Sequence, residues 1–143
     1  MADHPRSAAR RPRPLSPHVT VYHWPITMAA SITHRATGIA LSAGTLLVAW
    51  WLMAVSSGPE SGSFQLFTMV VTTPLGQVVL FGFVWALAYH FLNGVRHLAW
   101  DLGFGFDVRI ASLMSFLVFA LSIALAVGAF ALAYTGRVGY LQQ

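Results

Sequence analysis

The sequence has no cysteine, no lysine and few charged residues of any kind. Of its 143 residues, 8 % are charged and 57 % are hydrophobic, whereas a soluble domain carries about 25 % charged residues. A single water-soluble domain is therefore excluded, and the composition indicates an integral membrane protein. The absence of cysteine also excludes disulfides, cysteine-ligated zinc, iron–sulfur clusters and covalently attached c-type haem.

Three apolar stretches are long enough to cross a bilayer, which takes roughly 20 residues of α-helix. The predicted fold class is therefore all-α, with three transmembrane helices and little chain left for another domain. A turn-rich stretch follows the first span, and residues 64–73 are expected to add a short interfacial segment. The expected organisation is an arm (1–30), a transmembrane domain (31–136) with spans at about 31–56, 75–101 and 109–135, and a tail (137–143).

The arginines predict the orientation of the chain in the membrane. Four of them lie within the first 13 residues and two flank the 101–109 loop, whereas the 56–73 loop has none. The positive-inside rule then places the N-terminus and the 101–109 loop on the cytoplasmic or matrix side. The short N-terminal arm favours a bacterial inner (cytoplasmic) membrane, and the mitochondrial inner membrane is the alternative.

Ionisable residues inside a membrane span are costly and usually functional. In the second span, a turn of 100° per residue puts His90, His97 and Asp101 on one stripe and leaves Arg96 off it. His90 would lie about 16 Å below the helix end and His97 about 6 Å below it. In the first span, a helix that begins near residue 31 would leave the next histidine only about 5 Å deep.

The deep imidazole of His90 has two possible partners, a neighbouring helix through a hydrogen bond or a haem iron. If a haem is bound, its two axial ligands must approach from opposite faces. His90 and His97 lie on one side of the same helix, about 10 Å apart along it, and His34 is expected at the wrong depth to pair with His90. A second ligand would therefore have to come from another chain.

The residues Ser31, His34, Arg35 and Gly38 share one face of the first span at positions i, i+3, i+4 and i+7. Ser31 and Arg35 are either a helix N-cap and a snorkelling arginine or a site for a small polar head group. In the second interpretation, the hydroxyl and the guanidinium would donate to a quinone carbonyl. Trp24 and Met28 precede them, although Trp24 could equally belong to an aromatic belt at the membrane interface.

Two motifs in these segments resemble those of a known family. The first is R-P-L-S-P-H at residues 13–18, followed by W-P-I at 24–26 and S-I-T-H-R-A-T-G at 31–38; the second is H-F-L-N-G-V-R-H-L-A-W-D at 90–101. Together they are similar to the cytochrome b subunit of succinate dehydrogenase, the larger membrane anchor of respiratory Complex II. The similarity extends over about residues 13–135, and the three expected spans agree with it.

The resemblance implies specific roles. His90 would be an axial ligand of one haem b, with the second ligand supplied by a smaller anchor subunit. Ser31 and Arg35 would line the ubiquinone site, with Trp24, Met28 and Ile32 nearby. His34, His97 and Arg35 would lie near the haem propionates.

The implied partners are the second anchor subunit, an iron–sulfur subunit, a flavoprotein subunit and membrane lipid, with no nucleic acid. Succinate would be oxidised on the flavoprotein, because this chain has no nucleotide-binding segment. Two alternatives stay open: an anchor that works in a quinol:fumarate reductase, and a haem-free structural or transport membrane protein.

Overall fold

The computed structural model describes the backbone of residues 21–141 and the side chains of residues 21–136. The described part of the chain contains four helices: α1 (Ile26–Ser56), α2 (Gly62–Thr72), α3 (Pro74–Asp101) and α4 (Val108–Leu141). Three of them, α1, α3 and α4, are long and apolar enough to cross a membrane. The predicted all-α fold with three transmembrane helices is confirmed. The four arginines within the first 13 residues, on which the predicted orientation partly depends, lie outside the described residues.

The first helix begins five residues earlier than the sequence indicated. Pro25 is extended (φ −69°, ψ 149°), and its carbonyl accepts hydrogen bonds from the backbone amides of Met28 (3.0 Å) and Ala29 (3.2 Å). Because proline has no backbone N–H and a fixed φ, it starts a helix without losing a hydrogen bond. Ser31 is thus inside α1, and its interpretation as an N-cap is wrong.

The expected interfacial segment is an 11-residue helix, α2. Ser61 caps it by accepting a hydrogen bond from the Phe64 amide at 3.2 Å. Thr73 then caps α3 in the same way, accepting from Gly76 at 3.0 Å, with Pro74 in the first turn of α3. These two caps thus fix where α2 and α3 begin after the turn that follows α1.

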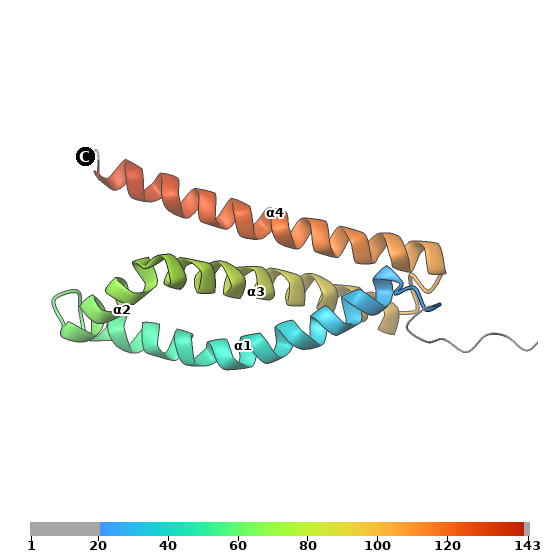
Figure 1. Cartoon of the computed structure of the whole chain (residues 1–143), viewed down its shortest axis with the longest axis horizontal. Coiled ribbons are helices and arrows are strands. Elements are labelled where there is room, and N and C mark those ends of the chain that lie inside the picture. The colour runs from blue at the N-terminus through green and yellow to red at the C-terminus, as the bar shows by residue number, and fades with distance from the viewer. Residues whose placement is uncertain (1–20, 142–143) are drawn as a thin grey trace, which may run out of the picture.

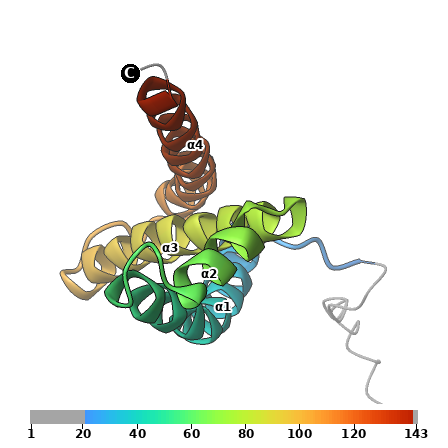
Figure 2. The same ribbon diagram turned by 90° about the vertical axis from the view of Figure 1, so that its left-hand side faces the viewer.

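Three of the helices form one layer, and α4 lies across it (Figure 2). Helices α1, α2 and α3 lie together, and α4 packs against the other side of α3, as Figure 2 shows. In Figure 1, α3 and α4 lie close at the end that contains the 102–107 loop, and they separate toward the C-terminal end of α4. Asp107 caps α4, since its side chain accepts from the amides of Arg109 (2.9 Å) and Ile110 (3.2 Å).

The buried core is small and lies along α3. Small side chains and one tyrosine dominate it; the buried hydrophobic residues are Ala30, Ala54, Ala86, Tyr89, Val118 and Ala126. Most of the large apolar side chains are exposed, as is expected where lipid or another chain covers the helices. Aromatic pairs add packing away from this core: Trp50 packs edge-on against Phe67 and Phe81 against Phe130.

Candidate functional site

Three histidines from two antiparallel helices meet in the half of the bundle that contains the start of α1. The rings of His34 and His90 are stacked, with centroids 3.9 Å apart and an interplanar angle of 15°. The ring centroid of His97 lies 5.3 Å from that of His34. Both α3 histidines therefore contact the same α1 residue, which confirms that they share a face of α3. Among the described residues, no three His, Asp or Glu side chains are grouped so that they could hold a metal ion together.

The His90 ring is fixed by its Nδ1 atom. This nitrogen lies 3.2 Å from the His34 carbonyl oxygen and 3.3 Å from the Thr37 hydroxyl oxygen. The Thr37 hydroxyl itself donates to the His34 carbonyl at 2.9 Å. With a proton on Nδ1, the ring donates to that carbonyl, and the lone pair of Nε2 is left for another partner.

A glycine lets the two helices approach each other at this point. A Cβ atom built on Gly38 would lie 3.1 Å from Cε1 of His90, closer than an ordinary van der Waals contact. The residue immediately before it, Thr37, is buried beside the same ring. The sequence S-I-T-H-R-A-T-G therefore supplies a carbonyl, a hydroxyl and a gap that together hold one imidazole.

The expected separation in depth between His34 and His90 is wrong. It assumed that the first helix begins near Ser31, whereas α1 begins at Ile26. The earlier start moves His34 about one and a half turns deeper, roughly 7.5 Å along the helix axis. The stacked rings present their flat faces to each other, so they still do not direct two nitrogens at one iron atom between them.

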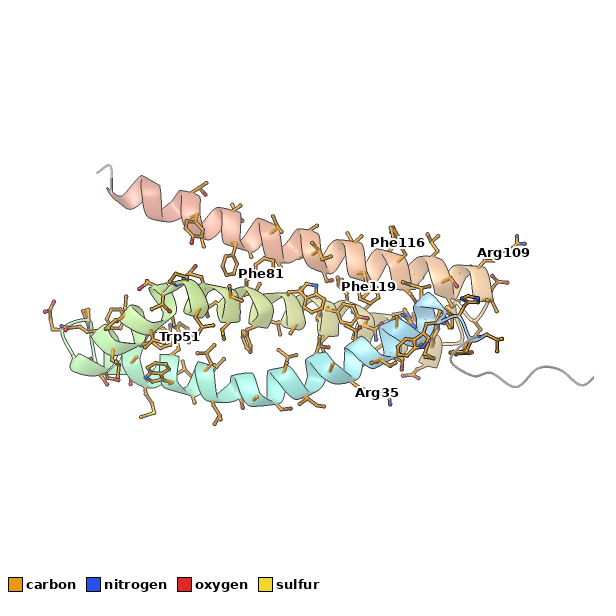
Figure 3. The ribbon with its side chains drawn as sticks, in the orientation of Figure 1. Arg35, Trp51, Phe81, Arg109, Phe116 and Phe119 are labelled. Carbon is orange, nitrogen blue, oxygen red and sulfur yellow. The ribbon has the colours of Figure 1, made fainter. Side chains whose placement is uncertain are left out.

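The single face predicted for α1 is divided. His34 and Gly38 face α3 through their contacts with His90, whereas Ser31 and Arg35 are exposed. Figure 3 shows the Arg35 side chain pointing away from the bundle. Residues at these four positions cover an arc of about 100°, so the two edges of that arc have different surroundings.

The residues expected around the head-group site form an open strip along the start of α1. Trp24 is 64 % exposed and Ile32 is 36 % exposed, and Met28 is half-buried with its sulfur 3.1 Å from the Tyr22 hydroxyl. Ser31 and Arg35 continue the strip. The strip places polar donors beside apolar side chains, and its outer side is not covered by the described part of this chain.

An apolar groove of about 650 Å³ runs between α1 and α3 and begins at this strip. Small residues of α1 form one wall and residues of α3 form the other. The residues that line it are Ile32, Thr33, Ala36, Thr37, Ala40, Ala43, Gly44, Leu47, Val79, Gly82, Phe83, Trp85 and Ala86. Ile32 and Thr37 thus connect the open strip, the groove and the His90 contact.

A second polar cluster lies between α3 and α4, around Arg96, which the sequence placed off the histidine stripe. Arg96 is 7 % exposed, and one of its terminal nitrogens donates to Asn93 Oδ1 and to Ser115 Oγ, each at 3.0 Å. Its guanidinium carbon lies 4.2 Å from the ring centre of Trp100. The i, i+3 spacing of Asn93 and Arg96 was visible in the sequence, but nothing distinguished Ser115 from the other serines of the last span.

Tyr89 is a further buried residue that the sequence did not single out. It is fully buried, and its hydroxyl donates to the Ala30 carbonyl at 2.9 Å. This bond ties the middle of α3 to the second turn of α1, close to the histidines. The ring also packs between Trp85 of α3 and Phe119 of α4.

Residues 9–129 match a family described as the succinate dehydrogenase/fumarate reductase transmembrane subunit. The succinate dehydrogenase cytochrome b556 subunit of Paracoccus denitrificans is 45 % identical over 115 residues, which are 80 % of this chain and 87 % of that protein. The mitochondrial cytochrome b560 subunit of Sus scrofa is 40 % identical over 81 % of this chain and 69 % of its own length. The cytochrome b556 subunit of Rickettsia typhi is 37 % identical over 79 % of this chain and 86 % of its own length.

Proposed function

The chain belongs to the family of succinate dehydrogenase/fumarate reductase transmembrane subunits, and we propose that it is the cytochrome b membrane anchor of a succinate:ubiquinone oxidoreductase. Membership makes it a membrane-spanning component of an oxidoreductase complex. The relatives described above are all named as succinate dehydrogenase subunits. Their names favour an anchor that serves succinate oxidation over one that serves fumarate reduction. The term cytochrome b in these names favours a haem-binding chain over a haem-free one.

One observation carries the haem assignment: the Nδ1 atom of His90 is committed to the His34 carbonyl (3.2 Å) within this chain. Histidines that ligate metals almost always donate their other ring N–H to a carbonyl or carboxylate, which fixes the tautomer and the ring orientation. The His90 environment fits an axial ligand of haem b on that ground. When bound, the haem supplies a one-electron redox centre within the membrane.

The other two histidines of the cluster fit the carboxylate-bearing edge of a haem. His34 Nδ1 is buried without a hydrogen-bond partner in the described part of the chain, and His97 lies beside it. We assign His34, His97 and Arg35 to the haem propionates, because charge-assisted hydrogen bonds to carboxylates are strong where water is scarce. The other axial ligand is assigned to a second, smaller anchor subunit, since His34 and His90 stack face to face.

The exposed strip at the start of α1 is the proposed ubiquinone site. The Ser31 hydroxyl and the Arg35 guanidinium would donate to a carbonyl oxygen of the head group, and they would stabilise the negative charge that develops there as electrons arrive. Trp24, Met28 and Ile32 would contact the ring of the head group. The strip is open on its outer side, so the proposal assigns the missing wall to the partner subunits.

The positions of the arginines indicate the side of the membrane on which the partner subunits would dock. Arg35 and Arg109 lie in the same half of the bundle in Figure 3, and residues 57–73, at the other end, contain no arginine. By the positive-inside rule that arginine-bearing end faces the cytoplasm or matrix. We propose that the iron–sulfur and flavoprotein subunits dock there, in a bacterial inner membrane or a mitochondrial one, with succinate oxidised on the flavoprotein.

Purification of the tagged full-length chain from its native membrane tests the proposal. We expect a flavoprotein, an iron–sulfur protein and a second small membrane protein to co-purify, together with a b-type reduced-minus-oxidised spectrum and succinate:ubiquinone reductase activity. A chain that purifies alone from mild detergent, without haem absorption or this activity, would overturn it. Measurement of haem and flavin per chain would further show whether one haem b is bound.

A further inference from the structure

The arginine buried between α3 and α4 has only neutral partners among the described residues. Arg96 donates to Asn93 and Ser115 and lies over the ring of Trp100. The three acidic side chains in the described range, Glu60, Asp101 and Asp107, are all exposed. An arginine keeps its charge in proteins, so this cluster contains a fixed positive charge that no described carboxylate neutralises.

Two nitrogen atoms of the cluster add to its positive character. Arg96 Nε and Asn93 Nδ2 are both buried, and neither has a hydrogen-bond acceptor in the described part of the chain. Both groups carry N–H donors and therefore present partial positive charge to their surroundings. The cluster is thus a source of positive potential rather than a balanced hydrogen-bond network.

The position of this charge relative to His90 makes it relevant to the proposed redox centre. The two residues lie on the same helix, six positions apart, which is about 9 Å along the axis. Salt screens exposed charges strongly and buried charges much less. The other two cations of the described side chains, Arg35 and Arg109, are exposed, so Arg96 is the cation whose field is least screened.

We propose that the buried Arg96 guanidinium raises the reduction potential of the haem held at His90. Reduction adds one electron and removes one positive charge from the iron, with no bond made or broken. A nearby fixed cation disfavours the more positive, oxidised state, and burial in a low dielectric strengthens this effect. This inference rests on the proposed function, because it needs a haem at His90.

The test is a redox titration of the haem absorption in the purified complex. Arg96→Gln removes the charge, Arg96→Lys keeps it with altered hydrogen bonding, and Arg109→Gln removes a charge from an exposed position. We expect a clear negative shift of the midpoint potential in Arg96→Gln, a potential close to that of the unaltered complex in Arg96→Lys, and a small shift in Arg109→Gln. An unchanged potential in Arg96→Gln, or equal shifts in the glutamine and lysine variants, would overturn the proposal.

A second pair of variants keeps the proposal testable if Arg96→Gln does not assemble with haem. Ser115 lies 3.0 Å from the guanidinium, so Ser115→Asp would place a carboxylate beside the charge and compensate it, whereas Ser115→Asn is the neutral control. We expect the negative shift in Ser115→Asp only. Equal potentials in the two variants, or loss of haem in every variant that alters charge while Ser115→Asn retains it, would show that the cluster serves assembly instead.

Two different results distinguish failure of the proposed function from failure of the electrostatic inference. If the unaltered complex has no b-type spectrum, or if His90→Ala leaves that spectrum intact, the proposed function is wrong. If the spectrum depends on His90 but its potential ignores the charge at Arg96, only the electrostatic inference is wrong.

Discussion

The two interfaces of α3 differ in what their polar groups do. Toward α1, the polar groups leave atoms unused: His90 commits Nδ1 but not Nε2, and His34 Nδ1 has no partner in the described chain. Toward α4, Trp85 donates to Ser122 at 3.1 Å, and the buried guanidinium of Arg96 donates to neutral partners only, with its Nε unpaired in the described chain. The first interface thus holds the imidazoles of the proposed haem site, and the second holds a buried positive charge beside helix-to-helix hydrogen bonds.

The backbone spacing shows the same difference. Gly38 and Gly44 stand where α1 approaches α3, and a Cβ on either would meet His90 or Phe83 respectively. The apolar groove follows this interface. Between α3 and α4 larger side chains fill the contact, including Tyr89 against Phe119 and Phe81 against Phe130. The two glycines of α1 thus let its backbone approach the side chains of α3 beside the candidate ligand.

The largest expected effect is loss of the haem on substitution of His90. His90→Ala removes the ring whose Nδ1 is held by the His34 carbonyl, so we expect the b-type reduced-minus-oxidised spectrum of the purified complex to be lost or strongly reduced. His23→Ala, which removes an exposed histidine at the start of the described chain, is the matched control and should retain the full spectrum. A full spectrum in His90→Ala would remove this residue as ligand.

A smaller effect is expected on the open strip of α1. Arg35→Ala or Ser31→Ala removes a donor to the developing negative charge, and a hydrogen bond to a charged group contributes about 1.5–3 kcal/mol. We therefore expect ubiquinone reduction to fall by roughly tenfold to a hundredfold. Succinate oxidation with an artificial soluble acceptor should be spared.

Arg109→Ala serves as the matched control for this prediction, because Arg109 is an exposed arginine in the same half of the bundle, as Figure 3 shows. It should affect neither activity. Equal losses of both activities in the Arg35 and Ser31 variants would mean that the strip is needed for assembly, not for the quinone.

The third prediction concerns the close approach at Gly38. Its added Cβ would lie 3.1 Å from Cε1 of His90, and overpacking of this kind costs about 1–3 kcal/mol. Gly38→Ala should therefore weaken haem binding by about fivefold or more, measured as haem content per complex. Gly94→Ala, where a Cβ meets nothing within 4 Å, should be neutral; equal haem content in the two variants would contradict the proposed packing.

The smallest effects compare single hydrogen bonds at the two interfaces. Tyr89→Phe removes the buried bond to the Ala30 carbonyl, and Ser122→Ala removes the bond to Trp85. Loss of a typical hydrogen bond costs about 1 kcal/mol, and those between membrane helices average about 0.6 kcal/mol. The free energy of unfolding in mixed micelles should fall by about 0.6 to 1 kcal/mol in each variant. The haem spectrum should be disturbed in Tyr89→Phe alone. A disturbed haem spectrum in Ser122→Ala would contradict the expected difference between the two interfaces.

The sequence allowed the spans to be predicted because apolar length is a property of each segment by itself. The shared face of His90 and His97 was also predictable, since it depends on helical periodicity alone. The start of α1 was not, because Pro25 begins the helix without a side-chain cap. That error of about one and a half turns led directly to the wrong relative depth of His34 and His90.

Contacts between helices were the part of the site that the sequence could not provide. Thr37 beside His90, and Ser115 beside Arg96, depend on the rotation and depth of one helix against another. Periodicity fixes which residues share a face but not which face meets which neighbour. The division of the α1 face between His34 and Arg35 was hidden for the same reason.

The most direct measurement is a high-resolution electron-microscopy map of the purified complex at the α1–α3 interface. We expect a haem b whose iron is bonded to Nε2 of His90 on one side and to a residue of a second small subunit on the other. An iron bound by two side chains of this chain, or a His90 ring that faces lipid with no haem beside it, would contradict the account.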